Sequence, residues 1–332
     1  MDLVTFGEGL IRLSLPSHRA VDLAAHVGGA ELNVAVAAAR LGIAARWVSR
    51  LPDNAPGRFI EGSARVQGVD ARVQWSAEGD RVGLYFLEQG SAPRQSSVVY
   101  DRAGSAFSHV SPGTIDWSSQ LRGARWFHVS GITPALSESA AAVTAESLKA
   151  AKAAGLIVSY DVNFRVKLWN AFRARVVQEP LMQYVDLLVV SEEDARNVFE
   201  AQGESAEAVA RVLAKRFAVR AVAVTVRDSA EGLGAVVVAE GTAVTGPRHD
   251  VDVVERVGTG DAFTAGLIAS RLEKRGWEEA VRFATGRAAL KLTMPGDFFA
   301  GDRADVETLL DRATADSSHS LRSGQALLRS SE

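Results

Sequence analysis

The sequence predicts an α/β protein built on a doubly wound, mostly parallel β-sheet with helices on both faces. Short apolar segments alternate with alanine-rich helical patterns along most of the 332 residues, and this alternation is typical of parallel strands joined by crossover helices. Aromatic residues make up only 7% of the chain, which favours helices packed on a sheet over a β-sandwich. Because 47% of the residues are hydrophobic, the chain can bury a sizeable core, as one large or two modest domains.

The composition excludes several classes of function. Acidic and basic residues are mixed along the chain and the net charge is −3, so no basic surface for nucleic acid is predicted. The absence of cysteine excludes disulfides, thiolate catalysis and cysteine-ligated metals. The N-terminus reads as a strand and not as a signal peptide, and no apolar run approaches the ~20 residues that span a bilayer. We therefore expect a soluble, cytoplasmic protein that binds neither nucleic acid nor membrane.

The first 68 residues begin the alternation with short strands and two helices. We expect strands over residues 3–6, 11–15 and 45–48, an alanine-rich helix that ends at Gly42, and a helix over residues 59–67.

Residues 69–110 have a different character, because they contain short strand patterns at 72–75, 82–87 and 97–100 and no good helix. This cluster predicts either a small separate sheet, such as a lid over a site, or an antiparallel extension of the main sheet.

The alternation resumes after residue 124 and continues almost to the C-terminus. We expect strands over 125–129, 156–162, 185–190 and 221–226, a hairpin of 234–239 with 242–245, and helices over 137–155, after Ser191, and over 207–217, 262–274, 278–292 and 303–313. Residues 313–332 are polar and rich in serine, which predicts a disordered tail after a single domain of residues 1–312.

The stretch from Val257 to Phe263 combines two glycines with an acid at the start of a helical pattern. Gly258 and Gly260 allow a tight turn and close approach of a ligand, and a helix start offers free N–H groups to a phosphate. Asp261 could cap the helix, which is a common role of aspartate. It could instead take the proton from an attacking hydroxyl group. A carboxylate would repel a phosphate that was merely bound, so the catalytic interpretation has weight.

A second glycine pair, Gly28-Gly29, precedes the alanine-rich helix, with Asn33 in its first turn. An asparagine inside a helix is unfavourable unless its amide has a partner. The segment is either a plain strand–turn–helix joint or a place where a ligand approaches the glycines and bonds to Asn33.

Several polar residues follow predicted strands at their carboxyl ends, where doubly wound sheets bind ligands. They are Asn163, Arg165, Ser191, Arg227 and the loop from Gly258 to Asp261. Because independent segments meet at one rim, a catalytic role for Asp261 is favoured over capping alone.

The segments 28–35 and 258–263 resemble the two signature motifs of the ribokinase-like (PfkB) sugar kinases, in the usual order and roughly the usual separation. Further segments resemble the members of this family that phosphorylate 2-keto-3-deoxygluconate: Gly7-Glu8-Gly9-Leu10, Gly28-Gly29-Ala30-Glu31, Gly83-Leu84-Tyr85, Arg102-Ala103-Gly104-Ser105-Ala106, Ser130-Gly131-Ile132-Thr133-Pro134-Ala135-Leu136, Asp161-Val162-Asn163-Phe164-Arg165 and Leu168-Trp169. The similarity spans about residues 2–312. It implies a ribokinase-like fold with a small β-sheet lid, formed by strands within about 10–24 and 69–110, and ATP-dependent phosphorylation of a sugar.

The resemblance also implies roles for individual residues. Asp261 would be the general base, and the amides of Gly258, Thr259 and Gly260 would form an anion hole for the γ-phosphate. Contacts to ATP would come from Asn163, Phe164, Arg165, Ser191, Arg227, Asp228, Ser229, Ala230, Glu231, Gly232 and the residues 258–261. Contacts to the sugar would come from Gly28, Gly29, Ala30, Glu31, Asn33, Tyr85, Tyr100, Asp101, Arg102, Arg165, Asp261 and Asp297.

The resemblance implies Mg²⁺ with the ATP and a homo-oligomer of undetermined size. Asp194 stands where a glutamate is usual and could organise Mg²⁺ through water. Many family members carry Asp-Thr-Thr before the second signature, whereas this chain has Glu255-Arg256-Val257, which leaves a site for a monovalent cation such as K⁺ open.

Arg102 and Arg165 favour an acidic sugar, because a guanidinium group suits a carboxylate. Arg102 could instead form a surface salt bridge, and Arg165 could serve the phosphates. Fructose, ribose or another sugar acid are alternative substrates, and a non-catalytic sugar- or nucleotide-binding protein is an alternative function. A NAD-dependent oxidoreductase is disfavoured, because no Gly-x-Gly-x-x-Gly follows the first strand.

Overall fold

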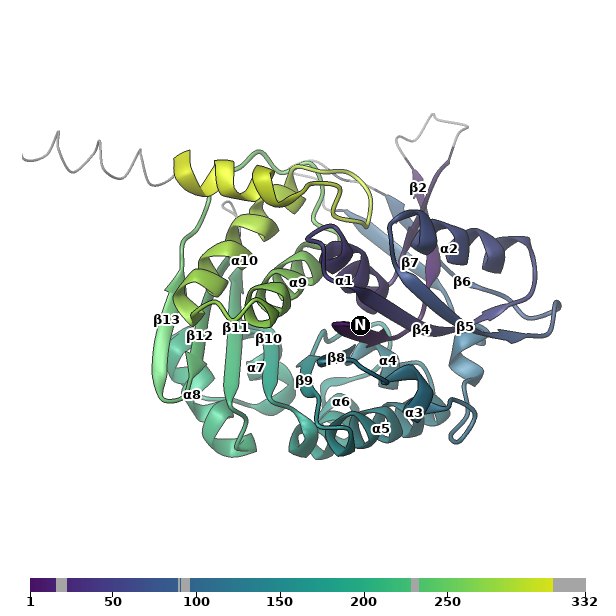
Figure 1. Ribbon diagram of the computed structural model, residues 1–332, viewed down its shortest axis with the longest axis horizontal. Helices are drawn as coiled ribbons and strands as arrows, with labels where there is room; N and C mark the ends of the chain where they lie inside the picture. The colour runs from purple at the N-terminus through teal and green to yellow at the C-terminus, as the bar shows by residue number, and fades with distance from the viewer. Residues whose placement is uncertain (16–22, 89, 91–95, 228–232, 313–332) are drawn as a thin grey trace, which may run out of the picture.

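The computed structural model describes residues 1–15, 23–88, 90, 96–227 and 233–312. Within them the chain forms a nine-stranded sheet, a separate four-stranded sheet and helices that pack on the larger sheet (Figure 1). This is the α/β architecture that the sequence predicts. None of the helices in these ranges is long and apolar enough to cross a membrane.

The large sheet is parallel except at one edge. Its strands, in spatial order, are β13 (Thr242–Gly246), β12 (Leu233–Ala239), β11 (Ala221–Arg227), β10 (Leu187–Ser191), β9 (Ile157–Asp161), β8 (Trp126–Ser130), β1 (Leu3–Phe6), β4 (Ala45–Pro52) and β5 (Asp70–Ser76). The strands from β11 to β5 pair in parallel, and the hairpin of β12 and β13 closes the edge in antiparallel fashion. The expected hairpin around Glu240-Gly241 is confirmed.

Helices cover both faces of the large sheet and enclose two apolar cores. In β10, Leu187 and Val189 join one core while Leu188 and Val190 join the other, as expected when successive side chains point to opposite faces. The first core contains residues of α1 (Ala30–Ala39), α2 (Ala55–Val66), α9 (Thr259–Leu272) and α10 (Trp277–Leu292). The second contains residues of α3 (Trp117–Gln120), α5 (Glu138–Ala153), α6 (Ala171–Gln178), α7 (Glu192–Phe199) and α8 (Ala206–Phe217).

Shorter elements complete the described chain. They are η1 (Phe107–His109), α4 (Ile132–Ala135), η2 (Glu179–Tyr184) and a helix over residues 303–312. Ser137 caps α5 as expected, since its hydroxyl accepts a hydrogen bond from the amide of Ala140. The polar tail of residues 313–332 lies outside the described residues.

The four-stranded sheet, called the small sheet below, stands beside the large one (Figure 1). Its strands in spatial order are β3 (Ala24–Gly28), β2 (Leu10–Leu15), β6 (Gly83–Glu88) and β7 (Ser97–Asp101). The expectation that every strand pattern of residues 69–110 belongs to such a sheet is wrong for β5. This strand follows β4 and the crossover helix α2, so it returns to the large sheet in parallel with β4.

The carboxyl ends of the parallel strands meet at one edge of the large sheet. Ser130 pairs with Asp161, and Ser191 pairs with Thr225 on the next strands. The predicted convergence of polar residues is therefore confirmed for this rim, which faces a cavity shared with the small sheet.

Candidate active site

A cavity of about 1130 Å³ lies between the rim of the large sheet and the small sheet. The large sheet and its loops contribute Asp161, Ser191 and Thr225, and the small sheet contributes Leu10 and Tyr85. A cavity of this size exceeds what one drug-sized ligand needs.

Asp261 lies in the first turn of α9 and borders this cavity. The N-cap of the helix is Gly258, and no side chain caps it, so the helix-capping interpretation of Asp261 is wrong. Its Oδ2 instead accepts a hydrogen bond of 2.7 Å from Nδ2 of Asn33. Asn33 lies in the first turn of α1, which follows the Gly28-Gly29 pair. The hydrogen bond therefore joins the starts of α1 and α9, the two helices that follow glycines. The amide of Asn33 thus has the partner that an asparagine inside a helix needs, while contact of residues 28–35 with a ligand stays a prediction.

Burial raises the pKa of Asp261 to about 7, against the lowering effects of the Asn33 hydrogen bond and the Arg165 charge. Burial likewise raises the pKa of Asp161 to about 7, and the charge of Asp261 adds to this shift. The two carboxyl groups therefore titrate as an interacting pair. A carboxyl group with a pKa near 7 is well matched to proton transfer at neutral pH.

The glycines at the two helix starts have different physical functions. Gly29 has φ +145°, and a Cβ atom there would lie 2.1 Å from the carbonyl oxygen of Glu8. Gly258 has φ +78°, and a Cβ atom there would lie 2.3 Å from the carbonyl oxygen of Asp297. A Cβ atom on Gly260 would meet open space, and Gly260 borders the cavity. Packing requires the first two glycines, whereas the third leaves room for a ligand.

The backbone N–H groups at the start of α9 are available to an anion. The first helical hydrogen bond there runs from the amide of Ala262 to the carbonyl of Gly258. Within the described part of the chain, the amides of Gly260 and Asp261 make no backbone hydrogen bond. Such orphan N–H groups at the positive end of a helix dipole suit a phosphate.

A buried ionic network joins the small sheet to the loops around α9. Arg12 of β2 is fully buried; its guanidinium pairs with the Glu255 carboxylate and, through Nε at 3.0 Å, with Oδ2 of Asp297. The hydroxyl of Tyr85 donates to Oδ1 of Asp297 at 2.7 Å. Glu255 also accepts a hydrogen bond from the amide of Gly296 at 2.9 Å. The carboxylate of Glu255 is thus engaged by protein groups.

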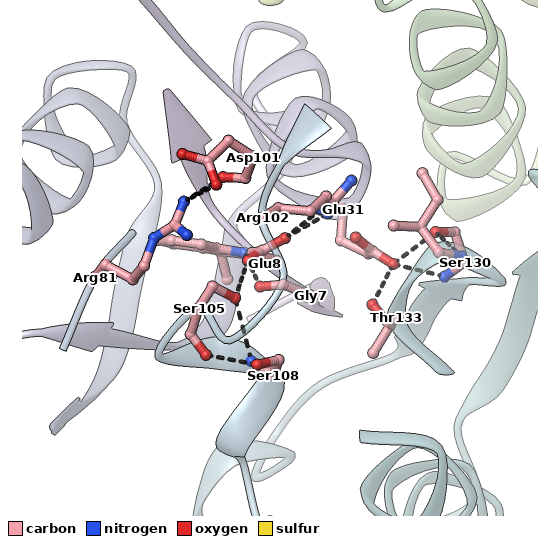
Figure 2. A network of polar contacts seen from close by, with 12 residues as sticks. Gly7, Glu8, Glu31, Arg81, Asp101, Arg102, Ser105, Ser108, Ser130 and Thr133 are labelled. Atoms are coloured by element: carbon pink, nitrogen blue, oxygen red, sulfur yellow. Dashed lines mark hydrogen bonds and ion pairs between the residues drawn. The ribbon is translucent and has the colours of Figure 1, made fainter. Parts of the chain in front are cut away.

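A second network fixes the loop after β1 and is shown in Figure 2. Glu8 accepts hydrogen bonds from Arg102, with Nε at 2.9 Å, and from the hydroxyl of Ser105. Arg102 is 6% exposed and borders the cavity. The expected alternative of a surface salt bridge is therefore wrong, since this ion pair is buried.

Most of the chain is similar to known sugar kinases. Residues 1–300 match the family described as pfkB family carbohydrate kinase. The chain belongs to this family of kinases. It is 39% identical over 313 residues to the 2-dehydro-3-deoxygalactonokinase of Haloferax volcanii, a match that covers 93% of this chain and 96% of that protein.

Solved structures agree with this family. The crystal structure of 2-dehydro-3-deoxygluconokinase from Thermotoga maritima has a TM-score of 0.89 and 37% identity, and the match covers 94% of this chain and 98% of that one. The structure of fructokinase with bound ATP from Xylella fastidiosa has a TM-score of 0.78 and 26% identity, and covers 94% of this chain and 99% of that one. The ribokinase-like fold and the assignment as a carbohydrate kinase, a phosphotransferase, are confirmed.

The structure brings most of the predicted site residues of the kinase to the cavity. Those that border it are Gly29, Ala30, Glu31, Asn33, Tyr85, Tyr100, Arg102, Asn163, Phe164, Arg165, Ser191, Asp194, Gly258, Thr259, Gly260, Asp261 and Asp297. Arg227 ends β11 at the same edge of the sheet. Residues 228–232, predicted to contact ATP, lie outside the described residues.

Two of the predicted sugar contacts do not border the cavity, and protein groups engage the carboxylate of a third. Asp101 does not border the cavity, because its carboxylate points to Arg81, 2.8 Å away, at an exposed position (Figure 2). Gly28 makes room for Asp297, whose Oδ1 would lie 2.3 Å from a Cβ atom there. Glu31 borders the cavity but its Oε1 accepts hydrogen bonds from Ser130 and Thr133 (Figure 2).

Acidic residues also surround the predicted nucleotide contacts of the kinase. The amide of Asn163, a residue with φ +40°, donates to Oδ1 of Asp161 at 3.0 Å. Burial raises the pKa of Asp194, while Ser191 and Arg165 lower it. Within the described residues no group of three or more His, Cys, Asp or Glu side chains could hold a metal ion. A magnesium ion that accompanies ATP would therefore find carboxylates such as Asp161 and Asp194 here but no complete protein cage.

Sequence reasoning missed four residues of this site as functional groups: Glu8, Arg12, Asp161 and Lys291. Arg12 interrupts an apolar strand pattern, and Lys291 interrupts the apolar face of α10. A charged residue at a position that the periodicity assigns to the interior is a signal of a buried polar or ionic contact, and it could have identified both.

The network around Arg12 generates a prediction about stability. Replacing Arg12 with methionine leaves the buried carboxylates of Glu255 and Asp297 without their cation, and we expect a loss of about 3–5 kcal/mol in the free energy of unfolding. The matched control is Arg173→Met, which removes an exposed pair with Glu138 and should cost less than about 1 kcal/mol. Urea denaturation at pH 7 measures both values. Equal losses for the two variants would contradict the assigned network.

Proposed function

We propose that this kinase transfers the γ-phosphoryl group of ATP to the primary hydroxyl of 2-keto-3-deoxygluconate, also called 2-dehydro-3-deoxygluconate, and forms the 6-phosphate. The observation that carries the proposal is the placement of Asp261. Its carboxyl group, whose pKa is raised to about 7, lies at a glycine-led helix start with free amides. The names of the relatives from Haloferax volcanii and Thermotoga maritima support a sugar acid as the substrate class.

In the proposed mechanism Asp261 is the general base. Asn33 holds Oδ2, and Oδ1 makes no hydrogen bond within the described part of the chain, so Oδ1 can accept the proton of the sugar hydroxyl. As that proton moves to Asp261, the hydroxyl oxygen bonds to the γ-phosphorus and the bond to the bridging oxygen of ADP breaks. Positioned proton removal of this kind typically contributes about 10²–10⁴ in rate.

The amides of Gly258, Thr259 and Gly260 would receive the γ-phosphate, with the free N–H of Asp261 beside them. Phosphoryl transfer depends mainly on positioning and on stabilising negative charge, and a helix start supplies fixed donors for both. Asn163, Phe164, Arg165 and Ser191 would hold the nucleotide. Mg²⁺ would neutralise phosphate charge when bound, and Asp194 would organise it through water.

Recognition of the sugar carboxylate is assigned to Arg165 with Arg102. Nε and Nη2 of Arg102 are engaged by Glu8, whereas the guanidinium of Arg165 bonds only to the carbonyl of Phe164 within the described residues. Arg165 therefore has more free donors for a carboxylate or a phosphate. Tyr85, Tyr100 and Asp297 would contact the sugar hydroxyls.

The cytoplasmic location and the homo-oligomer stay predictions.

A substrate panel with coupled detection of ADP tests the substrate class. We expect 2-keto-3-deoxygluconate to exceed fructose and ribose in kcat/KM by about 10² or more, because the free guanidinium donors of Arg165 would pair with the carboxylate of the sugar acid and find no such partner on a neutral sugar. The panel includes 2-keto-3-deoxygalactonate, which differs at one hydroxyl group. Faster turnover of fructose or ribose would contradict the sugar acid. Sugar binding without any turnover would favour a non-catalytic binding protein.

Replacement of Asp261 by asparagine tests the general base. We expect kcat to fall by about 10²–10⁴ with nucleotide affinity within about twofold of wild type. In the wild type, kcat/KM should fall as the pH drops through 7, because a raised pKa means that the carboxyl group is protonated, and useless as a base, below that value. The matched control is Asp101→Asn. Asp101 lies at the end of β7 in the small sheet, its side chain is exposed, and the variant should keep normal activity. Near-normal turnover by Asp261→Asn would remove the assignment.

A further inference from the structure

Lys291 lies in the last turn of α10 and is completely buried. Its ammonium donates to the carbonyl of Met294 at 3.0 Å, and this is the hydrogen bond that it makes within the described part of the chain. Its side chain also packs behind the glycine loop, since a Cβ atom on Gly258 would lie 3.2 Å from Lys291 Cε. Gly258 borders the cavity and Lys291 does not. The ammonium is therefore on the protein side of the loop that faces the cavity.

The charge of Lys291 is expensive to keep at this position. Burial lowers the pKa of Lys291 to about 8, while the charges of Asp297 and Asp261 raise it and that of Arg12 lowers it. The amine is thus mostly protonated at neutral pH. An unbranched apolar side chain would fill the same volume without this desolvation cost, and such replacements of buried charges are often neutral or stabilising. A buried charge at this position therefore calls for a role that methionine could not fill.

Capping of a helix C-terminus is one such role, because lysines near helix ends often bond to the last free carbonyls. A lysine can, however, make such a hydrogen bond from a half-exposed position, so capping alone does not require burial. Burial behind Gly258 adds something that capping does not need, namely a fixed positive charge beside the turn that begins α9. Carboxylates of Asp161, Asp261 and Asp297 surround the cavity, so an incoming phosphate enters a negative environment. In a site of low dielectric a nearby cation offsets this repulsion strongly.

We propose that Lys291 is a positioning residue for phosphoryl transfer, whose ammonium holds a fixed positive charge behind the Gly258–Asp261 loop and supports the binding of the γ-phosphate. It acts through the loop and does not touch the substrate. The inference rests on the proposed use of ATP by the loop, but it does not depend on which sugar is phosphorylated. Lys291 accordingly discriminates ATP from ADP, because only ATP brings a phosphate to the loop.

The test compares the affinities for ATP and for ADP by calorimetry in Mg²⁺ buffer without sugar. Lys291→Met removes the charge and the hydrogen bond, whereas Lys291→Gln removes the charge and keeps a donor for the carbonyl of Met294. We expect both variants to bind ATP about tenfold more weakly and ADP within about twofold of wild type, in line with the loss of one charge-assisted interaction. The matched control is Lys152→Met, which breaks a partly exposed pair with Asp186 and should change neither affinity.

Three outcomes would overturn the inference. Both variants could keep the wild-type ratio of ATP to ADP affinity, which means that the charge has no effect on the γ-phosphate. Lys291→Gln alone could keep the wild-type ratio of ATP to ADP affinity, which would assign the loss in Lys291→Met to the hydrogen bond with the carbonyl of Met294. Both affinities could fall together with the thermal midpoint, which shows a structural role. Because this assay needs no sugar, failure of the sugar panel in the wild type would count against the proposed substrate and not against Lys291.

Discussion

A single hydrogen bond of 2.7 Å between Asn33 and Asp261 joins two glycine-led helix starts that lie 228 residues apart in the sequence. Every other feature of the site depends on this approach of α1 to α9. Gly29 and Gly258 adopt left-handed conformations that admit neighbouring backbone where a side chain would collide, so each helix can begin at the cavity. The same approach buries Asp261, and burial is the main cause of its raised pKa. The close packing of α1 against α9 and the raised pKa of Asp261 therefore have the same structural cause.

Burying carboxyl groups at a site for phosphate requires cations that are held in place. Arg12 ties the small sheet to Glu255 and Asp297, and Tyr85 of the same sheet bonds to Asp297 as well. The small sheet is thus attached to the loops on both sides of the α9 and α10 pair. Arg102 is held by Glu8 in the same manner at the end of β1. These ion pairs fix the side chains around the cavity, which reduces the reorganisation that the reaction would otherwise need.

Much of this arrangement could be predicted from sequence, because its signals are local. Alternating strands and helices imply that the carboxyl ends of the strands meet, and glycines before a helix imply a tight turn with free N–H groups. The membership of β5 in the large sheet and the outward position of Asp101 depend on tertiary pairing, which local patterns do not contain. The hydrogen bond of Asp261 depends on Asn33, which is distant in sequence, so local patterns could not identify it. The burial of Arg12 and Lys291 was visible only as charges within apolar patterns, and the partners of Arg12 come from distant segments.

The protonation of Asp261 tests the central claim most directly, because a buried base with a pKa near 7 is the premise of the proposed chemistry. Carbon-13 NMR of the aspartate carboxyl groups, with Asp261→Asn to assign the resonance, follows this titration in the free protein. The account predicts that Asp261 titrates near pH 7, coupled to Asp161. A carboxylate that stays ionised down to pH 5 would contradict it.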